Sequence, residues 1–182
     1  GLENGLWTSW WENGTKKDEG IIKPGLKGDG NPKGTILVDL WQGWYANGKQ
    51  NYVGSYNSKG KKAGEWNYFY ENGERKETTD YSNDVAEGKS NVWYDNGLLY
   101  SASTYQHDKK QGEEIRYFFN GRISSVVNYK DGNKEGIAKY YTVDGNLSTV
   151  AQFKNDKQDG TETVYYANGK PSSVANYVNN LP

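Results

Sequence analysis

Side chains that commonly perform catalysis are few or scattered in this sequence. The single histidine, His107, lies in a polar, turn-like segment (QHDKK, residues 106–110), and there is no second histidine to complete a Ser-His-Asp triad. The sequence has no G-x-S-x-G motif and no cysteine, which excludes that nucleophile elbow, a thiol nucleophile, thiolate metal ligands and disulfides. We therefore predict no catalytic residue and expect a protein that is not an enzyme.

Acidic residues are spread along the chain rather than gathered as acid–base pairs or metal ligands. Glu71, Asp95 and Asp144 each lie at a predicted hairpin turn, where a carboxylate favours the turn. The segment GDGNP (residues 28–32) lacks the spaced Asp or Asn positions and the closing Glu of a calcium-binding loop, and we expect no helix after it to bind a phosphate. We predict no metal site and no cofactor.

Composition and charge exclude several functional classes. Lys and Arg number 22 against 23 Asp and Glu, so the chain has no net positive field for a nucleic-acid backbone. No apolar run is long enough to span a bilayer. Because the sequence does not begin with Met, we expect a processed chain and favour a secreted or cell-surface location over the cytoplasm. Hydrophobic residues make up 34%, so the 7 Trp, 16 Tyr and 4 Phe must supply most of the buried surface.

A repeat of 24 residues runs through most of the sequence. It appears in two glycine columns, Gly64, Gly88, Gly112, Gly136 and Gly160, and Gly73, Gly97, Gly121, Gly145 and Gly169. The units start near residues 5, 39, 64, 88, 112, 136 and 160. A loop insertion at residues 23–34 follows the first unit, either as a place for specific function or as a tolerated surface loop. We predict a single repeat array over residues 1–182.

Each unit has the sequence pattern of a β-hairpin. Asn72-Gly73 and its equivalents are typical of a two-residue type I′ turn, which would place Tyr70 opposite Arg75. No window shows the 3.6-residue period of a helix. The predicted fold is therefore all-β, an elongated antiparallel sheet of about seven tandem hairpins.

The predicted register divides the side chains between two faces. On one face, alternate residues of each second strand, such as Ser125, Val127 and Tyr129, have the sizes expected of a packed surface. On the other, the first aromatic residue of each pair recurs once per hairpin, as a ladder of rings that either packs within the domain or binds a partner's side chains or sugars. The predicted binding residues are Trp10, Trp44, Phe69, Trp93, Tyr117, Tyr141 and Tyr165.

The units from Gly64, Gly88 and Gly160 share the pattern G-x4-[aromatic]2-x-N-G-x7-Y. Over roughly residues 5–182 the chain resembles the bacterial variant of the MORN (membrane occupation and recognition nexus) repeat. The resemblance implies a sheet of hairpins that binds other macromolecules, since proteins with this variant include an antitoxin or immunity-type partner of a secreted toxin and many exported or surface proteins. Departures are Ile22 in place of the terminal Tyr, the shifted aromatic pair in the unit from Gly136, and the extra loop.

These observations leave three functional hypotheses. The leading one is a non-enzymatic protein that binds a protein partner, such as a toxin, through the aromatic ladder, the loop, or both. The second is a secreted or surface module that binds glycan or cell wall, although the units after Trp93 have no Trp for a ligand cage of the kind found in cell-wall-binding repeats. The third is a segment of a structural fibre or adhesin. Open strands at the sheet edges would also allow self-association.

Overall fold

The computed structural model describes residues 4–25 and 34–181, so most of the loop predicted at residues 23–34 lies outside the described residues. The described part forms strands and contains no helix. The strands are β1 (Gly5–Trp10), β2 (Lys16–Pro24), β3 (Thr35–Trp44), β4 (Gln50–Tyr56), β5 (Lys62–Phe69), β6 (Arg75–Ser82), β7 (Val85–Trp93), β8 (Leu99–Gln106), β9 (Lys109–Tyr117), β10 (Ile123–Lys130), β11 (Asn133–Tyr141), β12 (Leu147–Lys154), β13 (Lys157–Gln158), β14 (Gly160–Tyr165) and β15 (Pro171–Tyr177).

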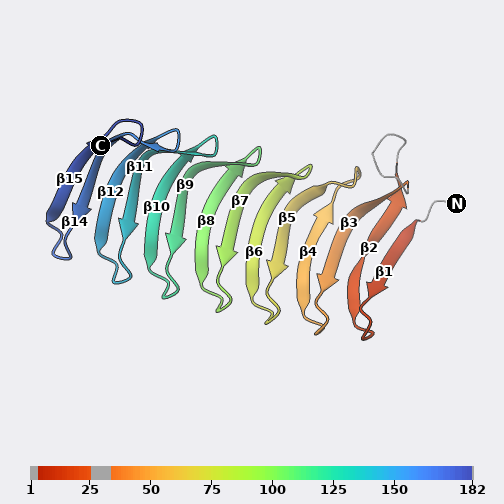
Figure 1. Ribbon diagram of the computed structural model, residues 1–182. Helices are drawn as coiled ribbons and strands as arrows, with labels where there is room; N and C mark the ends of the chain where they lie inside the picture. Colours follow the sequence, from red (N-terminus) through yellow and green to blue (C-terminus); the bar gives the residue numbers. More distant parts are fainter. Residues whose placement is uncertain (1–3, 26–33, 182) are drawn as a thin grey trace. The chain divides into compact units, whose positions relative to one another are not determined.

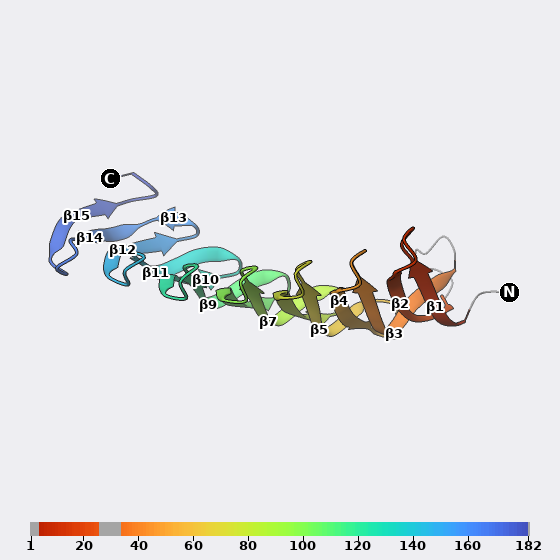
Figure 2. The same ribbon diagram turned by 90° about the horizontal axis from the view of Figure 1, so that it is seen from below.

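The strands pair with their neighbours in chain order, as a run of antiparallel hairpins in one open sheet (Figure 1). The order runs from β1 to β12 and then to β14 and β15, while the short β13 pairs with β12. The prediction of an all-β antiparallel sheet of tandem hairpins is confirmed. Each part of the sheet is a single layer of strands, with no described element packed over either face (Figure 2).

The chain divides into two compact units, which we describe separately. The N-terminal unit comprises Gly1–Gly88 and Asp95–Gly97, and the C-terminal unit comprises Lys89–Tyr94 and Leu98–Pro182. Strands β1 to β6 lie in the N-terminal unit and β8 to β15 in the C-terminal unit. Each contact discussed below lies within one of these units.

The Asn-Gly turns differ from the prediction. The Gly73 N–H donates to the Tyr70 carbonyl and the Tyr70 N–H donates to the Glu74 carbonyl, both at 2.8 Å. The loop therefore has three residues, of which only Gly73 has a positive φ (92°), whereas a type I′ turn has two residues that both have positive φ. The same two hydrogen bonds close the turns at Gly14, Gly48, Gly121, Gly145 and Gly169.

Two-residue turns with positive φ at both positions occur instead between the hairpins. Asn83 and Asp84 have φ values of 55° and 70°, and His107 and Asp108 have 51° and 62°. Asn, Asp and His tolerate this left-handed conformation better than other residues with a side chain. The remaining turns of this kind are Asp131-Gly132, Asn155-Asp156 and Asn179-Asn180. His107 is thus a turn residue, as its polar surroundings in the sequence indicate.

The longer Asn-Gly loop shifts the aromatic pair relative to the predicted register. Arg75 lies opposite Phe69, not opposite Tyr70, so the predicted partner of Tyr70 is wrong. A one-residue bulge follows, after which Glu77 lies opposite Tyr68. Ile123 and Pro171 likewise lie opposite Tyr117 and Tyr165. The first residue of each aromatic pair, rather than the second, is therefore the one that ends the paired strand.

One face of each unit carries most of the buried side chains, and we call it the packed face. In the N-terminal unit its centre is Trp41 and Trp66, which are 4% and 2% exposed. In the C-terminal unit Val127, Ala138 and Ala151 lie directly opposite one another on β10, β11 and β12 and are all buried. The prediction that alternate residues of the second strands are packed is confirmed at Val127 and Ala151.

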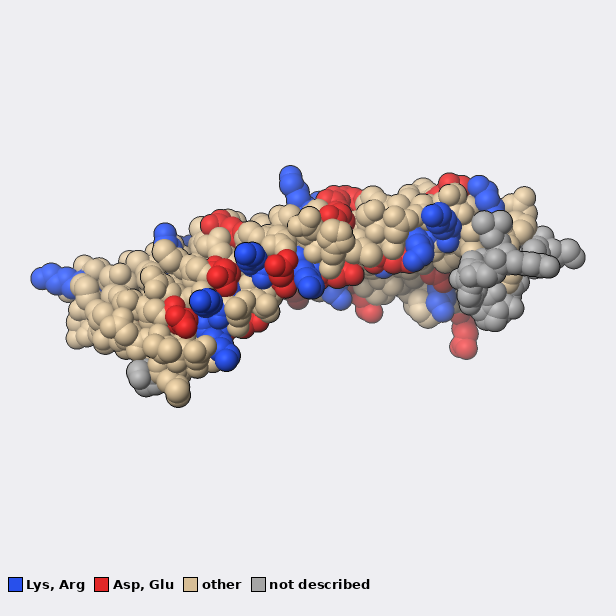
Figure 3. Space-filling view, turned by 90° about the horizontal axis from the view of Figure 1, so that it is seen from above, with Lys and Arg blue, Asp and Glu red and all other residues tan. Residues whose placement is uncertain are grey.

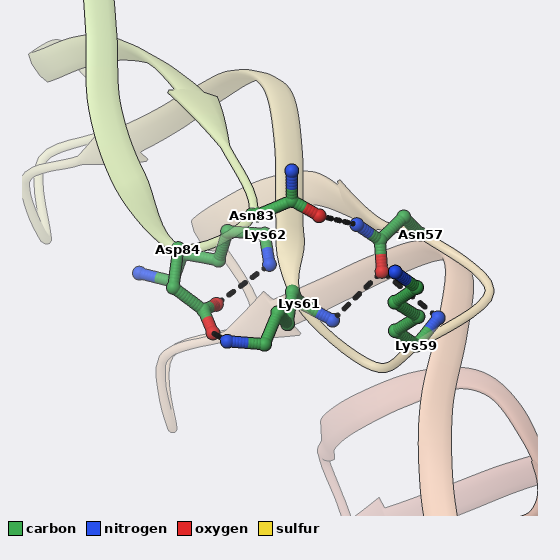
Figure 4. A network of polar contacts seen from close by, with 6 residues as sticks. All are labelled: Asn57, Lys59, Lys61, Lys62, Asn83 and Asp84. Atoms are coloured by element: carbon green, nitrogen blue, oxygen red, sulfur yellow. Dashed lines mark hydrogen bonds and ion pairs between the residues drawn. The ribbon is translucent and has the colours of Figure 1, made fainter. Parts of the chain in front are cut away.

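The two-residue turns are tied to the preceding hairpin by hydrogen bonds (Figure 4). The Asp84 N–H donates to the Lys62 carbonyl at 3.1 Å, and the Lys62 N–H donates to Asp84 Oδ1 at 2.7 Å. Beside them, Asn57 Nδ2 donates to Asn83 Oδ1 at 2.8 Å. The same two-point contact joins Asp156 to Lys134 and Asn180 to Gln158. Because one partner lies in the turn and the other in an earlier strand, each contact holds the turn against the preceding hairpin.

The asparagines of the Asn-Gly turns make a second series of links. Asn72 Oδ1 accepts the Glu74 N–H at 2.9 Å within its own turn, and Asn72 Nδ2 donates to the Asp95 carbonyl of the next turn at 2.6 Å. Bonds of both kinds are made by Asn13, Asn47 and Asn120. The asparagine therefore shapes its own turn and also holds the next hairpin.

Candidate interaction surface

The seven predicted binding residues occupy equivalent places, because each is the last residue of its strand. Trp10, Trp44, Phe69, Trp93, Tyr117, Tyr141 and Tyr165 end β1, β3, β5, β7, β9, β11 and β14. Trp10 is 62% exposed, and the other six are half-buried. A ladder of equivalent positions therefore exists, while its role in binding stays a prediction.

The second aromatic residue of several pairs links one hairpin to the next. Trp11 Nε1 donates to the Trp44 carbonyl at 2.9 Å, and the Tyr45 hydroxyl donates to the Phe69 carbonyl at 2.6 Å. The Tyr94 hydroxyl makes the corresponding bond to the Tyr117 carbonyl at 2.8 Å. At these positions the aromatic pair has a structural role, since one side chain is bonded to the neighbouring backbone.

A continuous set of ring contacts lies on the packed face of the N-terminal unit. Trp7 contacts Trp41 with ring centroids 5.6 Å apart, and Tyr56 lies 6.3 Å from Trp41 and 4.9 Å from Trp66. Tyr52 and Tyr68, which lie opposite each other on β4 and β5, are 6.0 Å and 6.2 Å from Trp66. We call this set the aromatic face: Trp7, Trp41, Tyr52, Tyr56, Trp66 and Tyr68. Trp41 and Trp66 form its buried floor, and the other rings are partly exposed.

Glycines on neighbouring strands make room for the floor of the aromatic face. A Cβ atom on Gly20 would lie 2.3 Å from the indole of Trp41, and one on Gly54 would lie 2.2 Å from the indole of Trp66. A Cβ on Gly43 would lie 2.1 Å from the Tyr52 ring. These distances are well inside van der Waals contact, so the rings lie directly against the backbone. The glycines therefore hold the rings in one place before any partner arrives.

Lys62 places its charge against the same rings. Its Nζ lies 4.5 Å from the Trp66 ring centroid and 5.0 Å from that of Tyr81, within cation–π range, and donates to the Tyr68 hydroxyl at 2.7 Å. Lys110 over Tyr129 and Lys134 over Phe153 repeat this arrangement in the C-terminal unit. The place beside the Trp66 ring where a cation could bind is thus already occupied by Lys62. We call this place the cation site of the aromatic face.

An acidic side chain anchors the edge of the aromatic face. The Tyr52 hydroxyl donates to Asp18 Oδ1 at 2.8 Å, and Ser9 Oγ donates to Asp18 Oδ2 at 3.0 Å. Burial, next the hydrogen bond to Asp18, and then the negative charge of Asp18 raise the pKa of Tyr52 well above its usual value. The phenol therefore keeps its proton and remains a donor to Asp18 at neutral pH.

In the C-terminal unit the position equivalent to Trp66, two residues after the first glycine of its unit, holds a buried carboxylate. Glu114 is 3% exposed and forms ion pairs with Lys110 and, at 3.0 Å, with Arg116 Nε, which has no hydrogen-bond geometry to any described residue. The Tyr129 hydroxyl donates to Glu114 Oε2 at 3.3 Å. Burial, and next the charge of Glu114, raise the pKa of Tyr129 to about 12. Three neighbours thus balance one buried negative charge.

This raised pKa predicts a loss of stability at alkaline pH. Because Tyr129 ionises more readily in the unfolded chain, near pH 10, its contribution is fully present below about pH 10 and is lost as the pH rises through about 12. We expect the melting temperature to fall across this interval, and to fall less in Tyr129→Phe. Thermal unfolding followed by circular dichroism across this range measures both. Equal pH dependence in the two proteins would contradict the assignment.

Two shallow hollows adjoin members of the predicted ladder. One is lined by Trp10 and Trp11 together with Glu12, Asn13, Lys17 and Ala46. Lys17 Nζ lies 4.7 Å from the ring centroid of Trp11. The other hollow is lined by Phe69 and by Tyr45, Asn51, Tyr68, Lys76, Glu77 and Tyr81. Trp10 and Phe69 are therefore ladder residues that line a surface hollow.

The three tryptophans of the aromatic face and Glu114 occupy the same column of the repeat, which sequence analysis missed. The column lies two residues after the start of each unit and reads Trp7, Trp41, Trp66, Ser90, Glu114, Ala138 and Glu162. The change in size and charge of this column from unit to unit is visible in the sequence. The predicted pairing of Tyr70 with Arg75 also implies Trp66 opposite Thr79, as observed, so strand alternation could have placed this column on the packed face.

In the described part of the chain, charged side chains and possible metal ligands are not gathered in one place. Acidic and basic side chains are interspersed on the face shown in Figure 3. In residues 4–25 and 34–181, no three His, Asp or Glu side chains come together as ligands for a metal ion. The same residues form no helix with the length and apolar character needed to cross a membrane.

The hairpins agree with a known repeat type over three segments. A family model described as the MORN repeat variant matches residues 62–83, 110–131 and 158–179, which begin 48 residues apart, or every second hairpin. A comparison with curated protein sequences finds no match. The chain therefore contains segments similar to the MORN repeat variant, a repeat type that generally serves as a module for interaction with proteins or membranes.

Proposed function

We propose that this protein is a non-enzymatic repeat protein that binds a protein partner through the aromatic face of its N-terminal unit. The observation that carries the proposal is a connected set of six rings on a face that no other described element covers. Trp and Tyr are common at the energetic centres of protein interfaces. Because Gly20 and Gly54 fix the floor, little conformational entropy is lost on binding.

The occupied polar groups narrow the chemistry of the partner. Lys62 already fills the cation site, and both Asp18 oxygens accept hydrogen bonds from Tyr52 and Ser9. The exposed parts of Trp7 and the tyrosines therefore suit apolar and aromatic side chains better than basic ones. Within this class, the resemblance to antitoxin-type repeat proteins supports a toxin as the partner and a secreted or cell-surface location for the complex.

Two tryptophans with different places on the surface provide a matched test. Trp7, 38% exposed, belongs to the aromatic face, and Trp10, 62% exposed, belongs to the predicted ladder. Affinity capture from an extract of the source organism would identify the partner, and calorimetry with the purified partner would measure its affinity. We expect Trp7→Ala to weaken binding at least about tenfold, as at a hot spot, and Trp10→Ala to have little effect. If Trp10→Ala weakens binding and Trp7→Ala does not, binding is assigned to the ladder. If both variants bind as tightly as the unmodified protein, both surfaces are refuted.

A glycan-binding module is the second candidate, favoured by the hollow that Trp10 and Trp11 line with Glu12 and Lys17. An exposed indole beside polar side chains is suited to stacking on a sugar ring while its hydroxyls are hydrogen-bonded. Titration of soluble polysaccharides, followed by tryptophan fluorescence, tests this alternative. Saturable quenching that is lost in Trp10→Ala would support it, and a flat titration would remove it.

A further inference from the structure

Among the described residues, no strand pairs with the outer edge of β1 or of β15, the first and last strands of the sheet order, and neither strand is charged. β1 reads GLWTSW and β15 reads PSSVANY, neither with a charged residue, although charged side chains commonly protect edge strands from pairing. Leu6 on β1 is 69% exposed and Val174 on β15 is 62% exposed. The residues equivalent to Val174 in earlier hairpins, Val126 and Val150, are half-buried because another strand lies beside them. The β15 edge thus lacks the neighbour that its equivalents have.

The junctions between successive hairpins share one register. In each junction, one partner lies five residues after the glycine of an Asn-Gly or Asp-Gly turn, as Val53 follows Gly48. The other partner lies three residues after the first glycine of the next unit, as Asn67 follows Gly64. The pairs are Val53 with Asn67, Ala102 with Ile115, Val126 with Lys139, and Val150 with Thr163. Applied to the two edges, this rule pairs Val174 with Thr8, and Ser173 with Ser9, of another chain. Pro171, which has no N–H to donate, precedes the segment that has to pair.

The last Asn-Gly turn also carries two donors of the kind that link hairpins elsewhere. Tyr166, equivalent to Tyr45 and Tyr94, is 57% exposed, and its hydroxyl has no partner among the described residues. Asn168 accepts the Lys170 N–H like the other turn asparagines, but its Nδ2 likewise has no described partner. By the geometry of the inner hairpins, these two donors would reach the Trp10 and Glu12 carbonyls of a first hairpin.

We propose that a second copy of this chain docks head to tail, with its β1 added to β15 of the first copy. The contact continues the existing hairpin-to-hairpin interface, with the same register and the same turn links. It uses different surfaces on the two copies, so it produces open chains or rings rather than a two-fold dimer. The proposal does not rest on the partner-binding function, since it is argued from the sheet edges and turn links; of the aromatic face only Trp7 lies on a docking strand, β1.

A pair of cysteines tests the register directly. The natural chain has no cysteine, so Thr8→Cys/Val174→Cys introduces two sulfurs that meet only between copies paired as proposed. Directly opposite residues on antiparallel strands have Cα atoms about 4.5 to 5.5 Å apart, within the range that a disulfide spans. Under mild oxidation at rising protein concentration, we expect a ladder of dimers, trimers and longer species on a non-reducing gel.

Two control variants separate the proposed pairing from random collision. Thr8→Cys alone can form at most a disulfide dimer. Thr8→Cys/Ala175→Cys points the two sulfurs to opposite faces of the sheet, since adjacent strand residues alternate. If the Thr8→Cys/Val174→Cys ladder is no stronger than that of this off-register control, or stops at dimers, the proposal is wrong.

Light scattering of cysteine-free protein gives a second measurement that does not depend on the disulfide. We expect the natural chain to assemble with concentration, and Tyr166→Phe to need about fivefold more protein for the same assembly, the effect of one lost hydrogen bond. The melting temperature of Tyr166→Phe should be unchanged at low concentration, because this hydroxyl has no described partner within the chain. Monomers at all concentrations would overturn the proposal.

Discussion

Gly54→Ala should lower the free energy of unfolding by about 3 kcal/mol, the upper end of the cost of overpacking a core. The added Cβ would lie 2.2 Å from the indole of Trp66, which is only 2% exposed and cannot move away within the same rotamer. Trp66 would have to leave the floor of the aromatic face or push β4 and β5 apart. Chemical denaturation followed by tryptophan fluorescence measures the loss.

Two further variants distinguish this steric effect from the general cost of replacing a strand glycine. Gly64→Ala lies in the same unit but has open space around its Cβ position, so only its positive φ (71°) opposes the change, at about 1 kcal/mol. Gly54→Ala/Trp66→Leu should lose less stability than the two single changes added together, because the smaller side chain leaves room for the methyl group. Equal losses for Gly54→Ala and Gly64→Ala would show that Gly54 does not support the Trp66 ring.

Glu114→Gln should destabilise the C-terminal unit by about 2 kcal/mol. The change removes the only negative charge in contact with Lys110 and Arg116 among the described residues, and leaves two cations beside a neutral amide. Breaking a fully buried ion pair costs about 3 to 5 kcal/mol, but the side chains of Lys110 and Arg116 are 24% and 41% exposed, so water compensates part of the loss. Thermal and denaturant unfolding of the purified variant measure the change.

The neighbouring residue gives a matched control for the loss of one negative charge. Glu113 is exposed and points to the opposite face of β9, so Glu113→Gln should change the free energy of unfolding by less than about 0.5 kcal/mol. In a double-mutant cycle, Lys110→Met should cost less in the Glu114→Gln background than in the natural chain. Additive effects would mean that Lys110 and Glu114 do not stabilise each other.

The residues that link the hairpins and the tryptophans of the candidate surface are different sets. Asn72 and Tyr45 link one hairpin to the next, and Lys62 and its equivalents pack on rings of the packed face. The tryptophans of the aromatic face come instead from the column that changes from unit to unit, with Trp66 in one hairpin and Glu114 in another. Stacked hairpins need the same links at every junction, whereas a binding surface can differ along the stack.

The sequence by itself determined the kind of fold and its period. Glycine spacing and the missing helical period predicted antiparallel hairpins, because only a few residue types tolerate positive φ and strands alternate their side chains. The same pattern predicted that Val127 and Ala151 would be packed, since these positions depend only on the strand period.

Only the tertiary structure decided which turn has two residues, which aromatic residue ends its strand, and how deeply each position is buried. Asn-Gly suits both a two-residue loop and a three-residue loop with glycine at positive φ. The longer loop changes only the pair beside the turn, because the bulge that follows restores the predicted pairing, with Glu77 opposite Tyr68. The bonds that select the longer loop include those from Asn72 and Tyr45 to the next hairpin, which local sequence does not reveal. The burial of Trp66 and Glu114 depends on neighbours from other strands, which the strand period alone does not identify.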